Sequence, residues 1–236
     1  MGGDDFFWQC SPRFRADTHI FAMTIAAKIC GLSSEEAVAV AVEGGASYLG
    51  FVFYPPSPRA IDPARAAALC AAVPSGIKRV GLFVDADDAA IRAVLEQAPL
   101  DILQFHGHES PERVVQAKLR FNRPVIKAIA IAGPEDVATA ELYEDDADML
   151  LFDAKPPRRP DALPGGNGLA FDWRLIAGHR WPRPWMLSGG LTAELLAEAV
   201  AASGASAVDV SSGVERRPGD KDPDKIREFL KVAASL

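Results

Sequence analysis

The sequence of 236 residues lacks the features of a secreted, membrane-spanning or metal-clustered protein. Its three cysteines, Cys10, Cys30 and Cys70, are an odd number and are too scattered for a disulfide framework or a zinc site. No apolar run approaches the roughly 20 residues of a membrane span, and the first residues lack the continuous apolar stretch of a secretory signal. We therefore expect a cytoplasmic protein with no metal site and no membrane partner.

Basic residues are also in deficit, because 25 lysines and arginines face 32 aspartates and glutamates, which gives a formal net charge of −7. This balance, without any basic cluster, argues against a nucleic-acid partner. An anionic substrate would need local positive groups to overcome the overall field. What is abundant is apolar: 49% of the residues are hydrophobic, and the length suits one large domain with a sizeable core.

Short apolar runs alternate with segments of helical apolar spacing from Met23 onward. The predicted strands are Thr24–Ile29, Tyr48–Phe53, Lys78–Val84, Asp101–Phe105, Val125–Ala130, Met149–Phe152, Trp185–Leu187 and Ala207–Val210. The predicted helices are Ser34–Glu43, Pro63–Ala72, Ala86–Gln97, Pro111–Leu119, Pro134–Tyr143, Ala193–Ala202 and Pro223–Ala233, with Phe171–Ala177 as the weakest. Eight near-equal units favour a closed (β/α)8 barrel, a TIM barrel of the α/β class, over an open doubly wound sheet.

No Gly/Ser-rich linker or charge run divides the chain, so we expect one catalytic barrel domain over residues 23–236. Residues 1–22 carry mixed charges and scattered aromatics without periodicity. We interpret them as a poorly ordered N-terminal extension. The alternative is an extra helix that covers the bottom of the barrel.

In such a barrel the functional residues follow the C-terminal ends of the strands. Lys28 and Cys30 share one face of the first strand, because side chains alternate along a strand. A lysine on a buried strand requires a polar or anionic partner, and its ammonium would lower the pKa of the Cys30 thiol. The alternative for Cys30 is a small buried apolar residue, as we expect for Cys70 in the second helix.

Polar residues also follow the second, fourth and sixth strands. A loop with three prolines places Arg59 near the barrel mouth, where a guanidinium suits a carboxylate or phosphate; a solvated surface arginine is the alternative. Gln104 and His106 share a face of the fourth strand, and each could be a satisfied structural group instead. Asp153 follows an apolar strand and is placed to protonate a substrate oxygen. Helix capping is the alternative for Asp153, but the proline-rich stretch Pro156–Pro164 weakens it.

Small residues gather after the last strands and predict an anion site. Ser188-Gly189-Gly190 precedes a predicted helix, Ser211-Ser212-Gly213 follows the eighth strand, and Gly165-Gly166-Asn167-Gly168 follows the sixth. Small residues let backbone N–H groups approach an anion, and many barrels bind phosphate after strands seven and eight beside a helix N-terminus. The sequence therefore predicts a small phosphorylated substrate.

Taken together, these motifs resemble those of the phosphoribosylanthranilate isomerases of tryptophan biosynthesis. The matching blocks are Lys28–Gly31, Gly50–Tyr54 with Ser57–Arg59, Val80–Val84, Gln104–Gly107, Leu151–Asp153, Gly165–Gly168 with Phe171–Trp173, Leu187–Leu191, and Ala207–Glu215 with Pro218-Gly219 and Lys221-Asp222. They follow the family order from Met23 to the C-terminus, and the ordered set is far more specific than any single block.

The resemblance implies an Amadori rearrangement of N-(5-phosphoribosyl)anthranilate to 1-(2-carboxyphenylamino)-1-deoxyribulose 5-phosphate. It implies that Asp153 is the general acid that protonates the ribose ring oxygen, and that Cys30 is the general base that removes the C2 proton. Arg59 would hold the anthranilate carboxylate, while His106 and Asp209 would also contact the substrate.

The same resemblance assigns the phosphate and the partners. The implied phosphate-binding residues are Gly166, Ser188, Gly189, Gly190, Ser211, Ser212 and Gly213. No cofactor and no metal is implied, because the substrate nitrogen supplies the electron sink. The enzyme would be a monomer or a homodimer. Leu169 departs from the family pattern, which often has a lysine there, and residues 1–22 have no family counterpart.

Two other classes of function compete with this interpretation. One is another phosphate-binding barrel, such as a ribulose-phosphate epimerase or an enzyme like indole-glycerol-phosphate synthase. A metal-dependent epimerase would need several His and Asp ligands at the barrel mouth, but only His106 among the histidines ends a strand. The other is a silent scaffold that binds a phosphorylated metabolite or a pathway partner. The presence of both Cys30 and Asp153 argues against it, because binding alone needs neither.

Overall fold

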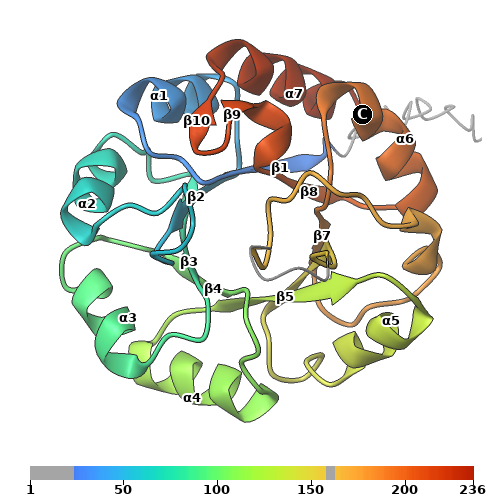
Figure 1. Ribbon diagram of the computed structural model, residues 1–236, viewed down its shortest axis with the longest axis horizontal. Coiled ribbons are helices and arrows are strands. Elements are labelled where there is room, and N and C mark those ends of the chain that lie inside the picture. Colours follow the sequence, from blue (N-terminus) through green and yellow to red (C-terminus); the bar gives the residue numbers. More distant parts are fainter. Residues whose placement is uncertain (1–23, 158–162) are drawn as a thin grey trace, which may run out of the picture.

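A computed structural model describes residues 24–157 and 163–236, so the predicted extension 1–22 lies outside the described residues. Eight parallel strands close into a barrel around which the helices form an outer ring (Figure 1). The strands are β1 (Ala26–Cys30), β2 (Tyr48–Val52), β3 (Lys78–Phe83), β4 (Ile102–Phe105), β5 (Val125–Ile131), β6 (Met149–Ala154), β7 (Trp185–Leu187) and β8 (Ala207–Val210). Pairing of β1 with β8 closes the sheet, which confirms the predicted barrel and excludes the open sheet.

In the part of the chain that the structure describes, seven α-helices cover the strands. They are α1 (Glu35–Glu43), α2 (Pro63–Ala71), α3 (Asp88–Leu95), α4 (Pro111–Phe121), α5 (Pro134–Glu141), α6 (Ala193–Ser203) and α7 (Pro223–Ser235). The predicted helix Phe171–Ala177 is wrong as an α-helix, because only the 3₁₀ turn Trp173–Leu175 forms there. Gly178 at a φ of 77° and the prolines that follow it leave no room for another helical turn.

Local signals explain where several helices begin. Ser34, Asp62 and Ser110 are in extended conformation, and their side chains accept a hydrogen bond from a backbone N–H in the first turn of α1, α2 and α4. Proline occupies the first turn of α2, α4, α5 and α7, where its missing N–H has no helical partner to lose. These signals are local, and the sequence therefore predicts the helix starts well.

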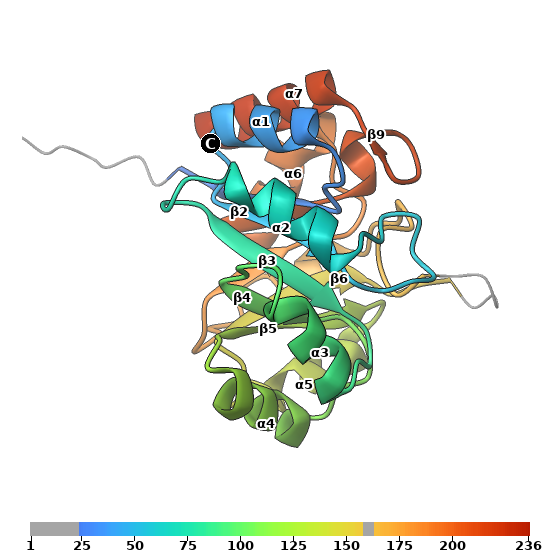
Figure 2. The same cartoon turned by 90° about the vertical axis from the view of Figure 1, so that its left-hand side faces the viewer.

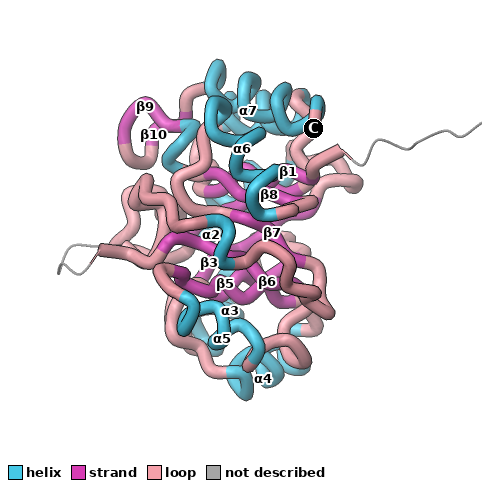
Figure 3. Tube along the Cα trace, turned by 90° about the vertical axis from the view of Figure 1, so that its right-hand side faces the viewer, coloured by secondary structure: helices cyan, strands magenta, loops and turns pink. Residues whose placement is uncertain are grey.

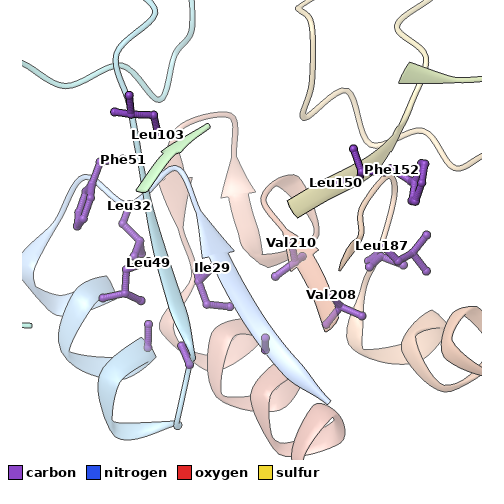
Figure 4. Close-up of a cluster of buried hydrophobic side chains, with 14 of the residues drawn as sticks. Ile29, Leu32, Leu49, Phe51, Leu103, Leu150, Phe152, Leu187, Val208 and Val210 are labelled. Atoms are coloured by element: carbon purple, nitrogen blue, oxygen red, sulfur yellow. The ribbon is translucent and has the colours of Figure 1, made fainter. Parts of the chain in front are cut away.

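Strand alternation divides the core into two shells. One set of side chains, which includes Ile29, Phe51, Leu103 and Phe152, faces the helices and builds the larger apolar cluster (Figure 4). The opposite set fills the barrel interior, where Val80, Ile102, Ile126, Leu151, Met186 and Ala207 form a separate buried cluster. This inner cluster plugs the lower part of the barrel, so polar side chains at the carboxyl ends of the strands have an apolar floor.

A short hairpin, β9 (Glu215–Arg217) with β10 (Asp220–Lys221), follows β8. The two side views place this hairpin at the end of the barrel where the loops after the strands project (Figures 2 and 3). Helix α7 then packs between α1 and α6 and completes the ring (Figure 1). No helix in the described ranges is long and apolar enough to cross a membrane.

Candidate active site

A pocket of about 730 Å³, which includes open space at its mouth, lies at the carboxyl ends of the strands. Every site residue predicted from the sequence lines it. The set is Cys30, Arg59, His106, Asp153, Gly166, Ser188, Gly189, Gly190, Asp209, Ser211, Ser212 and Gly213. Residues separated by up to 183 positions, which is the difference between 213 and 30, are therefore brought to one cavity.

The predicted anionic partner of Lys28 is Asp209 on β8. Lys28 is fully buried, and its Nζ donates to Asp209 Oδ1 at 2.7 Å. The Ser188 hydroxyl donates to the other carboxylate oxygen at 3.1 Å. Burial alone would lower the pKa of Lys28, but the buried carboxylate outweighs it and raises this pKa above its ordinary value. Asp209 is therefore held in place at the pocket floor by hydrogen bonds to both of its carboxylate oxygens.

Cys30 ends β1, and its thiol lies beside Lys28 against Gly50. A Cβ on Gly50 would come within 2.9 Å of the Cys30 sulfur and 3.1 Å of the Lys28 Nζ, so only glycine leaves room for both groups. Burial raises the pKa of the Cys30 thiol; the nearby Lys28 ammonium lowers it but does not cancel the rise. The predicted lowering by Lys28 is therefore present, but burial sets the net direction of the shift.

Cys70 provides a useful contrast to Cys30. It lies on α2 within the apolar shell, outside the pocket lining, and burial raises the pKa of its thiol to about 11. This agrees with its interpretation as a small buried apolar residue.

The side chain of Asp153 lies on β6 and is hydrogen-bonded on both of its oxygens. Oδ1 accepts from the backbone N–H of Ala154 at 2.9 Å, and Oδ2 lies 3.1 Å from His106 Nε2. His106 Nδ1 in turn lies 3.0 Å from the amide Nε2 of Gln104, so the shared face predicted for these two residues places them in one hydrogen-bonded row. Asp153 does not cap a helix, which removes the alternative interpretation of this residue.

Arg59 is buried rather than solvated, and its bidentate partner belongs to the protein. Its Nε and Nη2 donate to the two carboxylate oxygens of Glu215 at 2.8 and 2.9 Å, and Nη2 also donates to the carbonyl of Gly166 at 3.1 Å. Glu215 accepts a further bond from the buried Lys221 at 2.8 Å. Although burial opposes ionisation, the two cations hold the pKa of Glu215 below its ordinary value. Nη1 is the guanidinium nitrogen that has no hydrogen bond within the described ranges.

The loops after β7 and β8 meet backbone to backbone. A Cβ on Gly213 would lie 1.9 Å from the carbonyl oxygen of Leu191, so a side chain there would push the loops apart. Gly189 and Gly190 have φ values of 87° and 65°, which favour glycine. Thr192 precedes α6 without a side-chain cap, so its hydroxyl does not occupy the N–H groups of the first turn, and the neighbouring Leu191 lines the pocket. These loops can surround an anion with backbone donors.

Two buried residues of this site received no role from the sequence, namely Glu215 and Lys221. Lys221 Nζ donates to the Ser211 carbonyl at 2.9 Å, and Ser211 Oγ donates to the Cys30 carbonyl at 3.1 Å. The hairpin is thus tied to both the phosphate loop and β1. The burial of Arg59 requires a carboxylate partner such as Glu215, but no signal in the sequence indicates which one. In the described residues no cluster of three His, Cys, Asp or Glu side chains could hold a metal ion.

A family model for N-(5'-phosphoribosyl)anthranilate isomerase matches residues 27–232, which is most of the chain. The chain belongs to the phosphoribosylanthranilate isomerase family. Isomerases of this name from Rhodospirillum centenum and Paracoccus denitrificans are 55% and 54% identical to it, over 91% and 90% of this chain and 100% and 99% of theirs.

Solved structures of phosphoribosylanthranilate isomerases share the barrel. The Thermotoga maritima enzyme superposes with a TM-score of 0.80 at 38% identity, over 90% of this chain and 100% of that chain. Another isomerase structure, which contains reduced 1-(o-carboxyphenylamino)-1-deoxyribulose 5-phosphate, has a TM-score of 0.77 at 36% identity over the same shares. Family membership and the barrel fold are therefore confirmed.

Proposed function

We propose that this chain catalyses the Amadori rearrangement of N-(5-phosphoribosyl)anthranilate in L-tryptophan biosynthesis, an intramolecular aldose–ketose isomerisation. The observation that carries the proposal is that Cys30 and Asp153, from strands on different sides of the barrel, line one pocket with loops suited to phosphate. Membership of the isomerase family supports it, as does the relative that contains a reduced analogue of the product.

Substrate binding uses the two ends of the pocket. The 5-phosphate accepts hydrogen bonds from the loops after β7 and β8, with Gly166 adding a donor from the loop after β6. The anthranilate carboxylate binds Arg59 through Nη1, because Glu215 already occupies the edge formed by Nε and Nη2. Asp209, fixed by Lys28 and Ser188, accepts from a sugar hydroxyl. The ribose then spans the space between thiol and carboxyl group.

Ring opening is the task of Asp153. Its carboxyl proton passes to the ribose ring oxygen while the C1–O bond breaks and the anilino nitrogen lone pair forms a C1=N double bond. The products are the open-chain protonated Schiff base and the Asp153 carboxylate. The backbone N–H of Ala154 and the His106 ring, both in hydrogen-bonding distance of this carboxylate, then stabilise the charge.

Proton removal at C2 is the task of the Cys30 thiolate. The C–H electron pair forms a C1=C2 double bond, and the C=N electrons return to nitrogen, which gives the enolamine. Loss of the C2 hydroxyl proton and protonation of C1 then produce the ketone, so atoms and electrons balance within the substrate. The Lys28 ammonium beside the sulfur stabilises the thiolate once it forms.

The test follows the fluorescence of phosphoribosylanthranilate, formed from anthranilate and phosphoribosyl pyrophosphate, as purified protein consumes it. We expect turnover by the unmodified protein, and losses of about 10²–10⁴-fold for Asp153→Asn and of at least that size for Cys30→Ala. Cys70→Ala is the matched control, because it removes a buried thiol outside the pocket. Unchanged rates in Cys30→Ala or Asp153→Asn would remove that residue from the mechanism, and no turnover by the unmodified protein would refute the proposed reaction.

Two subsidiary proposals concern the protein as a whole. We infer a cytoplasmic enzyme, which fits free thiols at Cys30 and Cys70, and we expect a monomer or homodimer by sedimentation. A chain that begins at Met23 should keep full activity, because the barrel closes without residues 1–22. Loss of folding on that truncation would contradict the division at residue 22.

A further inference from the structure

The interior face of β4 presents a buried amide that the reaction as proposed does not use. Gln104 is fully buried below the pocket, and its Nε2 lies 3.0 Å from His106 Nδ1. His106 Nε2 lies 3.1 Å from Asp153 Oδ2, so one row of hydrogen bonds runs from the barrel interior to the general acid. The Gln104 carbonyl oxygen Oε1 is buried and finds no hydrogen-bond partner in the described ranges. A buried acceptor without a donor is unfavourable and requires an explanation.

The two faces of an amide group select two different forms of the imidazole. With the amide nitrogen toward the ring, Gln104 donates to Nδ1, so Nε2 carries the hydrogen and donates to an Asp153 carboxylate. With the carbonyl toward the ring, Nδ1 carries a hydrogen and donates to Oε1. Nε2 can then accept the proton of a neutral Asp153, or share it as part of an imidazolium ion paired with the carboxylate.

These two arrangements correspond to the two ends of the acid step, so this inference rests on the proposed function. Before ring opening the His106–Asp153 pair holds an extra proton. A half-turn of the Gln104 amide then places Oε1 beside the ring, where it accepts a hydrogen bond from Nδ1–H of His106. After the proton has passed to the substrate, the orientation seen in the structure stabilises the carboxylate. We propose that Gln104 is a positioning residue, whose amide sets the tautomer of His106 and so stabilises Asp153 in its protonated and its ionised form in turn.

The surroundings leave His106 as the direct titratable partner of Asp153. Cys30, Tyr54, Arg59 and Asp209 are the other titratable or charged side chains of the pocket lining, and Asp209 is already paired with Lys28. Gly165 covers the contact, since a Cβ there would lie 2.7 Å from His106 Nε2 and 2.8 Å from Asp153 Oδ2. A side chain at 165 would therefore separate the pair, and the glycine leaves it intact.

The first test observes His106 directly by ¹⁵N NMR of histidine-labelled protein without substrate. In the unmodified protein, at a pH above the limb at which the acid is lost, we expect the tautomer with hydrogen on Nε2. In Gln104→Glu the carboxylate can only accept at Nδ1, so Nδ1 should become protonated. An unchanged His106 signal pattern in Gln104→Glu would overturn the inference, whether or not the protein turns over substrate.

The second test is the pH profile of kcat/KM. Gln104→Glu favours the form in which the His106–Asp153 pair keeps its proton. The fall of kcat/KM at high pH, which marks loss of the acid's proton, should therefore move to higher pH by about one unit. Gln104→Met has similar volume but no polar atoms, and it should lower kcat with little change in KM. Gln97→Glu, at an exposed turn position just beyond the end of α3, is the control for added charge. Equal losses at all pH values with an unshifted limb would indicate a packing role only and refute the inference.

Discussion

The ion pair between Lys28 and Asp209 permits a quantitative test of how the pocket floor is stabilised. At 2.7 Å and an effective dielectric constant of about 20, two unit charges attract by about 6 kcal/mol. Much of this attraction offsets the desolvation of both groups, so the pair itself adds little net stability. Removal of one partner is different, because the other charge stays buried. We expect Lys28→Met to lower the free energy of unfolding by about 3–5 kcal/mol.

The double variant Lys28→Met/Asp209→Asn separates these contributions. It removes both charges, so its loss should be smaller than the sum of the two single losses by a coupling energy of about 2–3 kcal/mol. In thermal unfolding, the single change should lower Tm by about 6–20 °C, at 2–4 °C per kcal/mol for a domain of this size. Urea unfolding of the four proteins measures the cycle. Additive single losses, or a loss below about 1 kcal/mol for Lys28→Met, would refute a buried, mutually dependent pair.

The pH dependence of this stabilisation has a definite sign. The pKa of Lys28 is raised in the folded protein, so its contribution is fully present below the ordinary lysine value of about 10.4 and is lost only as the pH rises toward the folded-state value. Stability measured between pH 6 and 9 should therefore show no step from Lys28. A marked loss in that range attributable to Lys28 would contradict the assignment of its partner.

Three further predictions concern other parts of the site. Because burial raises the pKa of Cys30, thiolate absorbance in a variant with Cys30 as its only cysteine should titrate above the ordinary value of about 8.5, and a midpoint below 8 would contradict this. Gly213→Ala should cost about 1–3 kcal/mol of stability and weaken inorganic phosphate binding, because the new Cβ meets the Leu191 carbonyl. In the control Gly76→Ala the new Cβ lies in open space, so neither stability nor phosphate binding should change. Glu215→Gln should destabilise the protein by about 3–5 kcal/mol at pH 7. Because the pKa of Glu215 is lowered in the folded protein, its contribution to stability is present above about pH 4.3 and is lost on acidification, so the effect of the variant should shrink below that pH. A pH-independent loss in urea unfolding would contradict the ion-pair account.

The sequence predicts the barrel well because its signals are local. Each strand is a short apolar run, and every helix start except that of α6 has a side-chain cap or a proline, so the predicted bounds differ from the observed ones by only a few residues. The exception is Phe171–Ala177, where apolar spacing suggests a helix. The following glycine and prolines reduce it to a 3₁₀ turn.

The predicted site residues also converge on one pocket, because the carboxyl ends of parallel strands meet at one end of a barrel. What could not be predicted were pairings across the chain. Arg59 and Glu215 are 156 positions apart, and no local pattern indicates that a glutamate occupies the bidentate edge of the guanidinium. The net direction of the Cys30 pKa shift could not be predicted either, because burial of the strand end raises this pKa while the nearby Lys28 lowers it.

The apolar plug inside the barrel has a consequence for the order of events during turnover. Because Val80, Ile102, Ile126, Leu151 and Met186 fill the lower interior, the described pocket opens at the carboxyl ends of the strands. Product would leave through the opening by which the next substrate arrives, and in the proposed assignment both molecules bind the loops after β7 and β8. Product must therefore leave the pocket before the next substrate binds, and a high product concentration should slow turnover by occupying the pocket.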